Sequence, residues 1–181
     1  MYDNKARTIT TERLRLRPFE LSDAERVSEL CNNYNIYKST LTLPHPYPIE
    51  SALNWIPTHK ENFDNDKSYE FAITDKNTGV LYGAIGLSNI KSHKNGEVGY
   101  WIGEPFWGNG YGTEALGALI DFAFNHKNYH RVFARCFESN PASGRVLQKV
   151  GMEYEGKQID HIFKENKYET ILMYGIVKQA E

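Results

Sequence analysis

The sequence predicts an α/β fold of the α+β kind, with a mixed, mostly antiparallel twisted sheet of about seven strands flanked by helices. Three observations predict it. Strand-type alternation and turn signals follow one another from residue 69 to residue 103. An amphipathic pattern then covers residues 112–126, with Leu116, Leu119 and Ile120 on one helical face. Two further strand patterns end the chain, and short turns between strands favour antiparallel pairing.

The first elements of the chain are one strand and one helix. Residues 13–17 alternate strictly between Arg and Leu, which predicts a half-buried strand with its leucines facing inward. Pro18 ends this pattern. Ser22 or Asp23 is expected to cap a helix that runs to about Leu30.

The middle of the chain begins with a proline-rich segment. Every second residue of the segment 43–48 is a proline, so this segment is expected to form an extended loop. Residues 51–63 are helical in pattern, and Pro57 should break or kink that helix. The later strands are expected at 69–73, 80–90, 97–103, 131–137, 152–159 and 168–177, and the later helices at 112–126 and 141–150.

Length, charge and cysteine content narrow the class of protein. A chain of 181 residues fits one domain, 1–181, with a core at about 11–177. Its net charge of -2 argues against a dedicated nucleic-acid binder. Cys31 and Cys136 have no CxxC spacing and the six histidines form no ligand pattern, so no disulfide framework and no metal site are expected. The lack of a membrane-length apolar run or a signal segment predicts a cytoplasmic protein.

The strongest chemical signal is a glycine-rich turn in front of the helix at 112–126. Residues 107–115 read Trp-Gly-Asn-Gly-Tyr-Gly-Thr-Glu-Ala, with glycines at every second position. Glycines let backbone N–H groups converge on an anion, and a helix N-terminus adds positive potential. The turn therefore predicts a pyrophosphate site, and the alternative is a turn whose glycines have a structural role alone. It lacks the Gly-Lys-Ser/Thr of a nucleotide-binding P-loop, and its glycine spacing differs from a dinucleotide fingerprint.

At this turn the sequence resembles the GNAT superfamily of acyl-CoA-dependent N-acetyltransferases, and within it the RimJ/RimL-like branch that acetylates ribosomal proteins. The acetyl-CoA loop of that family, Arg/Gln-x-x-Gly-x-Gly/Ala, aligns with residues 107–112. The resemblance extends through residues 11–19, 96–102 and 140–152. Trp107 departs from the family pattern, because it stands where the family has Arg or Gln. That change is expected to remove a polar contact to the phosphates and to leave the backbone donors intact.

The resemblance implies acetyl-CoA as cosubstrate and no metal. It also implies a sheet that splays at the acetyl-CoA site, where the pantetheine arm lies like an extra strand. The expected contacts come from the end of the preceding strand, from the loop and from the cap of the late helix. The residues are Trp101, Ile102, Gly103, Trp107, Gly108, Asn109, Gly110, Tyr111, Gly112, Thr113 and Asn140.

Direct acetyl transfer needs a base for the amine and a partner for the leaving thiolate. Glu97 is the candidate base, acting directly or through water, because similar enzymes carry a catalytic Glu in this strand; the alternative is a solvated glutamate at a strand start. Ser143 is the second candidate catalytic residue, as a hydrogen-bond donor to the sulfur. Its alternative is an ordinary first-turn residue of a helix that Asn140 caps.

The acceptor is expected to be selected by the aromatic-rich segment 34–47, with Tyr37, Leu43, His45 and Tyr47 as candidate contacts. The predicted protein is an acyltransferase that acetylates a primary amine, the N-terminal α-amine of a ribosomal or other protein. Two alternatives are the same reaction on a polyamine, amino acid or aminoglycoside, and a CoA-binding module without catalysis. The expected partners include no nucleic acid and no membrane, and the chain is expected as a monomer or homodimer.

Overall fold

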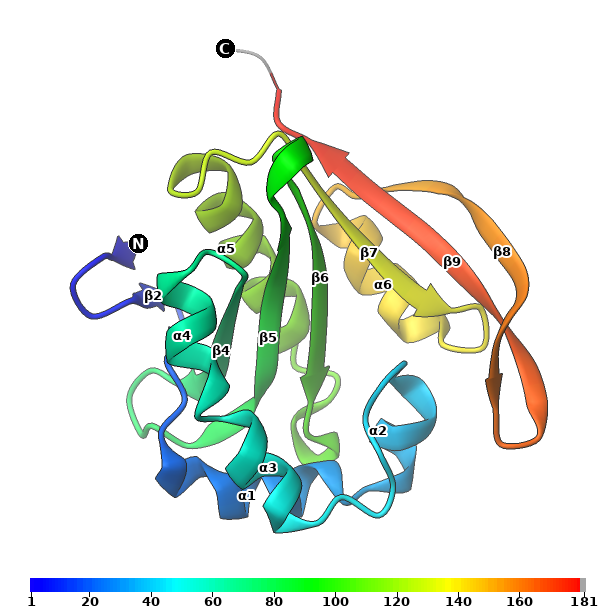
Figure 1. Ribbon diagram of the computed structural model, residues 1–181, viewed down its shortest axis with the longest axis horizontal. Coiled ribbons are helices and arrows are strands. Elements are labelled where there is room, and N and C mark those ends of the chain that lie inside the picture. The colour runs from blue at the N-terminus through cyan, green and yellow to red at the C-terminus, as the bar shows by residue number, and fades with distance from the viewer. Residues whose placement is uncertain (180–181) are drawn as a thin grey trace.

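The computed structural model describes residues 1–179, apart from the side chain of Lys91, and contains one nine-stranded sheet with helices on both faces (Figure 1). The strand order is β1-β2-β3-β4-β5-β6-β7-β9-β8, and every neighbouring pair is antiparallel except β6 and β7. The strands are β1 Tyr2–Asp3, β2 Thr8–Thr10, β3 Leu14–Arg17, β4 Ser68–Asp75, β5 Leu81–Ile90, β6 Asn95–Ile102, β7 Arg131–Phe137, β8 Glu153–Lys164 and β9 Lys167–Val177.

The helices form a layer on each face of the sheet. Helices α1, α3 and α4 cover one face and α5 and α6 the other, while α2 lies beside the end of the sheet where β6 and β7 diverge (Figure 1). None of the helices in residues 1–179 is long and apolar enough to span a bilayer. The helices are α1 Ala24–Cys31, α2 Tyr34–Ser39, α3 Ile49–Trp55, α4 Thr58–Asp64, α5 Tyr111–Asn125 and α6 Pro141–Lys149.

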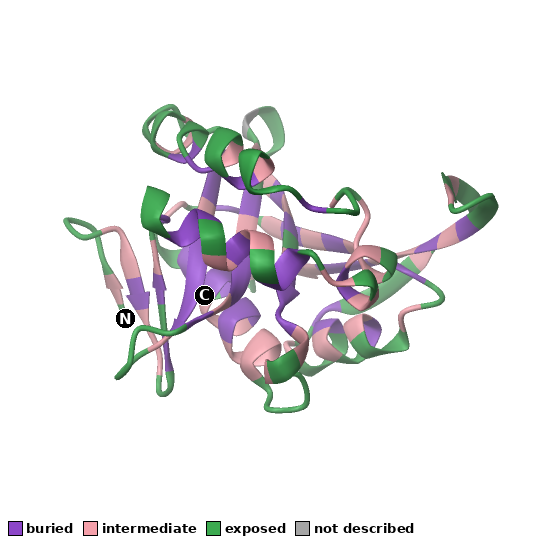
Figure 2. Ribbon diagram, turned by 90° about the horizontal axis from the view of Figure 1, so that it is seen from below, coloured by how far each residue is buried: buried purple, intermediate pink, exposed green. Residues whose placement is uncertain are grey.

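The sheet separates two hydrophobic cores, visible as the buried interior in Figure 2. The larger core lies under α5, where Leu16, Phe71 and Leu119 are almost fully buried. The smaller core lies under α1 and α3 and includes Val27 and Trp101. Because alternate residues of a strand face opposite sides, each central strand contributes to both cores. The inward leucines expected at residues 13–17 are confirmed.

Most elements lie where the sequence predicts them. The helical pattern at 51–63 is broken at Pro57 into α3 and α4, as expected. The number of strands is larger than the predicted seven or so, because β1 and β2 are too short to show an alternating pattern. Helix α2 is also additional. Its cap is Asn33, whose side chain accepts from the N–H groups of Asn35 and Ile36.

The first helix begins differently from the expectation. A single 3-10 turn at Leu21–Asp23 precedes α1, and the Asp23 carboxylate accepts from the Glu20 N–H. The same carboxylate pairs with both terminal nitrogens of Arg17, and the side chain of this arginine is only 22% exposed. Asp23 therefore joins the end of β3 to the start of α1.

Strands β6 and β7 pair at only one end. Their parallel register runs from Asn95 opposite Arg131 to Val98 opposite Ala134 and then stops. Each strand keeps its other partner beyond that point, since β6 pairs with β5 as far as Ile102 and β7 with β9 as far as Phe137. The two strands therefore diverge, and we call the opening between them the wedge (Figure 1). This confirms the predicted splay.

Candidate active site

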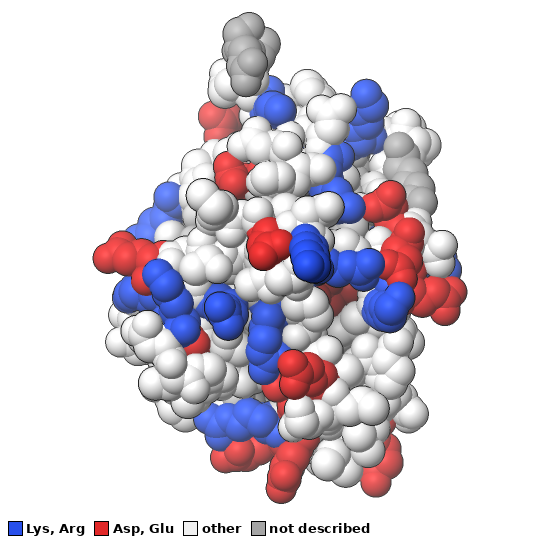
Figure 3. All heavy atoms as spheres, turned by 90° about the vertical axis from the view of Figure 1, so that its left-hand side faces the viewer, with Lys and Arg blue, Asp and Glu red and all other residues white. Residues whose placement is uncertain are grey.

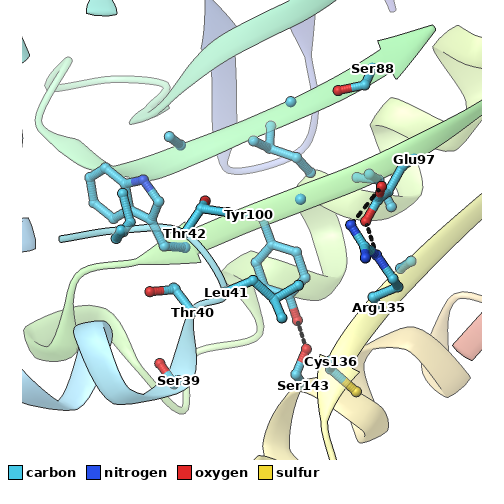
Figure 4. Close-up of a pocket in the computed structure, with 18 of the residues that line it drawn as sticks. Ser39, Thr40, Leu41, Thr42, Ser88, Glu97, Tyr100, Arg135, Cys136 and Ser143 are labelled. Carbon is cyan, nitrogen blue, oxygen red and sulfur yellow. Dashed lines mark hydrogen bonds and ion pairs between the residues drawn. The ribbon is translucent and has the colours of Figure 1, made fainter. Parts of the chain in front are cut away.

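A cavity of about 400 Å³ occupies the wedge (Figure 4). One wall comes from strands β4, β5 and β6, and the opposite wall from β7 and α6. Trp55 of α3 and residues 39–43, which follow α2, close it from the side of the smaller core. The polar side chains that line it are Ser39, Thr40, Thr42, Glu70, Ser88, Glu97, Tyr100, Arg135, Cys136 and Ser143.

Two glycines form the floor of the cavity. Gly86 of β5 lies in register with Gly99 of β6 on one side and with Glu70 of β4 on the other. A Cβ atom on Gly99 would have no atom within 4 Å, and one on Gly86 would lie 3.4 Å from Cγ of Glu70. The floor is therefore open above Gly99, and the Glu70 side chain lies over Gly86.

Two carboxylates border this floor in different electrostatic surroundings. Arg135 donates to both oxygens of Glu97, from Nε at 2.6 Å and from Nη2 at 3.2 Å (Figure 4). Glu70 accepts a hydrogen bond of 3.0 Å from the Ser68 hydroxyl, and burial raises the pKa of its carboxyl group. The sequence pointed to Glu97 and missed Glu70. The only signal in the sequence that could have pointed to Glu70 is its position as a charged residue within an otherwise apolar strand.

Ser143 and Tyr100 meet at the α6 side of the cavity. Their hydroxyl oxygens are 3.2 Å apart (Figure 4), and burial raises the pKa of Tyr100 to about 12. Asn140 caps α6 by accepting from the Ser143 N–H at 3.2 Å, as expected. Cys136 is a buried thiol, and burial raises its pKa to about 11, which fits the predicted packing role and leaves it protonated.

The glycine-rich loop leads into a helix whose first N–H groups are free of a side-chain cap. Gly108 and Gly110 have φ values of +78° and +79°, a conformation that favours glycine. Gly110 is the residue before α5, and no side chain caps the helix there. Arg13 holds the loop, since its Nη1 donates to the Asn109 carbonyl at 2.9 Å, and its charge is paired with Glu114 in the first turn of α5. This arrangement can bind an anion at the start of a 15-residue helix.

Trp107 closes back onto the end of β6. Its indole Nε1 donates to the Ile102 carbonyl at 2.6 Å, while its side chain stays partly exposed. The Gly103 N–H is also engaged, because it donates to the Tyr82 carbonyl at 2.7 Å. The Ile102 carbonyl and the Gly103 N–H are two of the backbone groups predicted to bind pantetheine, and both already have a hydrogen-bond partner within the chain.

The predicted acceptor residues divide into two pairs. Leu43 lines the main cavity and, with Tyr47, also lines a second cavity of about 530 Å³. The two cavities share Thr42, Leu43, Trp55 and Trp101, so together they run from the carboxylates to the surface beside α3. Tyr37 and His45 stack on each other with ring centroids 5.4 Å apart and lie outside the lining of both cavities.

Residues 37–40 are tied to the far side of the wedge. Lys164 of β8 donates to the carbonyls of Tyr37 and Thr40, at 2.6 Å each. The Asn140 side chain donates to the Ser39 carbonyl at 3.3 Å. The site is thus assembled from both ends of the chain. Within residues 1–179, no three His, Cys, Asp or Glu side chains are grouped as a metal site.

Comparison with known proteins agrees with this geometry. The sequence profile of the acetyltransferase (GNAT) domain matches residues 13–153. An uncharacterised N-acetyltransferase of Bacillus subtilis, YnaD, is 31% identical over 94% of this chain and 97% of its own. The [ribosomal protein uS5]-alanine N-acetyltransferase of Escherichia coli is 27% identical over 88% of this chain and 85% of its own.

A solved structure shares the fold. It is described as RimL, a ribosomal L7/L12 α-N-protein acetyltransferase, in complex with coenzyme A. Its TM-score is 0.85 at 20% sequence identity, and the match covers 94% of this chain and 97% of that one.

Proposed function

The chain belongs to the GNAT acetyltransferase family, in its RimJ/RimL-like branch, and from this we propose that it transfers the acetyl group of acetyl-CoA to the N-terminal α-amine of a protein. The observation that carries the proposal is the wedge. It joins an anion-binding loop to a cavity bordered by carboxylates, and it lies where the central sheet has unpaired strand edges.

The donor side of the site is proposed as follows. The backbone N–H groups of residues 108–113 hold the pyrophosphate, and Arg13 fixes the loop through its hydrogen bond to the Asn109 carbonyl. The pantetheine arm lies along the open edge of β6 near Trp101 and Ile102, and Asn140 binds the arm from α6. The Ser143 hydroxyl, supported by Tyr100, donates a hydrogen bond to the thioester sulfur.

The acceptor side is proposed from the shape of the two cavities. An amine that ends a flexible chain can reach the carboxylates while the rest of the chain lies in the second cavity, between Leu43 and Trp55. A protein N-terminus has this shape. Relatives named as ribosomal-protein acetyltransferases support the same acceptor class, because they include a uS5-alanine N-acetyltransferase and a putative ribosomal N-acetyltransferase, YdaF, 28% identical over 93% of this chain.

The test is a thiol-release assay with acetyl-CoA and a panel of amines. Peptides that carry ribosomal-protein N-termini are compared with the same peptides blocked by Nα-acetylation, and with spermidine, free amino acids and an aminoglycoside. We expect turnover on the free peptides and none on the blocked ones. Turnover on small amines alone would move the function to metabolite acetylation. Acetyl-CoA binding without turnover on any amine would contradict the proposal.

A further inference from the structure

Glu70 is the acidic side chain of the cavity that the sequence analysis did not use. It lies on β4, next to Gly86 and in line with Gly99, and no side chain from either glycine stands between it and the wedge. Its Cγ atom lies over Gly86, and one carboxylate oxygen accepts from Ser68 on the same strand, so the carboxylate lies at the β4 side of the open floor above Gly86 and Gly99. A larger residue at position 86 would crowd this side chain.

The charge balance distinguishes Glu70 from Glu97. The Glu97 carboxylate is neutralised by Arg135, which engages both of its oxygens. Within the described residues Glu70 has no ion-pair partner, and its side-chain hydrogen bond comes from the neutral Ser68 hydroxyl. A half-buried carboxylate without a cation favours a positively charged ligand or a proton. An acceptor ammonium supplies both.

We propose that Glu70 is the general base of the acetyl transfer: it binds the acceptor ammonium above Gly99 and takes its proton. The inference rests on the proposed function, and it gives to Glu70 the role that the sequence analysis assigned to Glu97. Glu97 then acts as a positioning residue, holding Arg135 against the wall of the cavity.

The proposed step conserves atoms and charge. The ammonium transfers one proton to the Glu70 carboxylate, and the freed lone pair attacks the thioester carbonyl carbon, so that a C–N bond forms. The tetrahedral intermediate collapses, the C–S bond breaks and the thiolate leaves with the electron pair. The nitrogen then loses its extra proton to the thiolate, which gives the acetylated amine and the free thiol of CoA, and Glu70 releases to solvent the proton that it took.

The titratable and charged groups around Glu70 are few. From β6 they are Glu97 and Tyr100, and from β7 Arg135 and Cys136. From α3 the cavity is lined by Trp55, which does not titrate and which packs on His59 of α4 with ring centroids 4.3 Å apart. Residues 39–43 contribute no titratable group. Burial raises the pKa of Glu70 above its ordinary value. A raised pKa brings a carboxylate closer to the pKa of an α-amine, which is about 8, and makes it a better base at neutral pH.

The experiment compares Glu70→Gln with wild type over a pH range, with a peptide that the wild type acetylates. At pH 7 we expect kcat to fall about 100-fold or more, as is typical when a general base is removed. The loss should shrink above about pH 8, where the amine is already neutral. The acid limb of the kcat/KM profile should move up to the pKa of the amine, about 8, because only the neutral amine reacts without the base. Acetyl-CoA binding and the melting temperature should stay unchanged. Glu61→Gln, in an exposed part of α4, is the matched control.

Three results would overturn the role of Glu70. One is a Glu70→Gln variant that keeps kcat within about threefold of wild type at pH 7. Another is a loss that is the same at every pH, and the third is a loss matched by weaker acetyl-CoA binding. If Glu70→Gln does not fold, Glu70→Asp replaces it and should keep the acid limb below the pKa of the amine with a reduced kcat; a limb that moves up to about pH 8 would count against the proposal. A wild type that binds acetyl-CoA but acetylates no amine overturns the proposed function itself.

Discussion

At the scale of single residues, His59 is a buried histidine without polar partners. Neither ring nitrogen has a hydrogen-bond partner within the described residues, and the ring packs against Phe19 and Trp55. Burial lowers its pKa to about 4 from the ordinary 6.5. The unfolded chain therefore binds the proton more readily than the folded protein does. Folding stability is complete above pH 6.5 and falls as the pH drops from 6.5 toward 4.

The loss of folding stability at acid pH that follows from the lowered pKa of His59 gives a prediction for His59→Phe. The variant should be at least as stable as wild type at pH 7.5, because it removes two unpaired ring nitrogens from an aromatic cluster. Between pH 7.5 and pH 5 wild type should lose about 2 kcal/mol more stability than the variant, from the proton linkage of one such histidine. Urea unfolding of both proteins at the two pH values measures this difference. Equal losses would show that His59 is not the group responsible.

At the scale of elements, the start of α5 depends on Gly110. Its left-handed φ of +79° would strain any residue with a Cβ by about 1 kcal/mol. Gly110→Ala should therefore lower the melting temperature slightly, and should weaken acetyl-CoA binding about tenfold or more because the N–H groups of the loop turn away from the phosphates. Gly79→Ala is the control, with φ of +75° and no atom near its added Cβ. Calorimetric titration should show reduced affinity for the Gly110 variant and unchanged affinity for the Gly79 variant.

The elements also show what the sequence can and cannot predict. Long periodic segments such as β7 and α5 were predicted within about one residue, because burial imposes their periodicity. The glycine-rich loop was found because its chemistry is local. The sequence did not point to Glu70, because the place of Glu70 in the cavity depends on the register of β4, β5 and β6. That register brings together residues 70, 86 and 99. Helix α2 was missed because six residues are too few for a periodic pattern.

At the scale of the whole molecule, the wedge predicts where acetyl-CoA changes the dynamics. The backbone groups that face the wedge have no partner strand beyond Val98 and Ala134. Hydrogen exchange should therefore slow most at residues 99–102 and 108–113 when acetyl-CoA is added. Residues 95–98, which are already paired with β7, should change little and serve as the internal control. Uniform protection across the sheet would contradict binding in the wedge.

The surface adds a second property at this scale. On the side that carries β1 and β2, acidic and basic side chains are intermixed (Figure 3), and some form ion pairs, such as Arg7 and Lys60 with Asp64. The opposite end carries the β8–β9 hairpin, whose exposed large apolar residues are Tyr154, Ile159, Phe163, Tyr168 and Val177. The hairpin also carries charged side chains, among them Lys157, which pairs with Glu138, and Lys167, which pairs with Glu169. Both ends of the sheet therefore have charged surface, and the hairpin adds exposed apolar residues to it.

The short β6–β7 pairing also has a consequence for recombination between relatives. Residues 1–126 contribute six strands of the sheet and residues 130–179 the other three. Within the sheet these two segments meet in only four residue pairs. A chimera that exchanges the second segment with that of a homologue has to match those four pairs, the packing of α5 against β7 and α6, and the hydrogen bonds from Lys164 and Asn140 to residues 37–40. Because residues 39–55 and 108–113 both lie in the first segment, an exchange of the second segment would leave them unchanged and would replace α6 and the β8–β9 hairpin. The turn after α5 is therefore a natural crossover point.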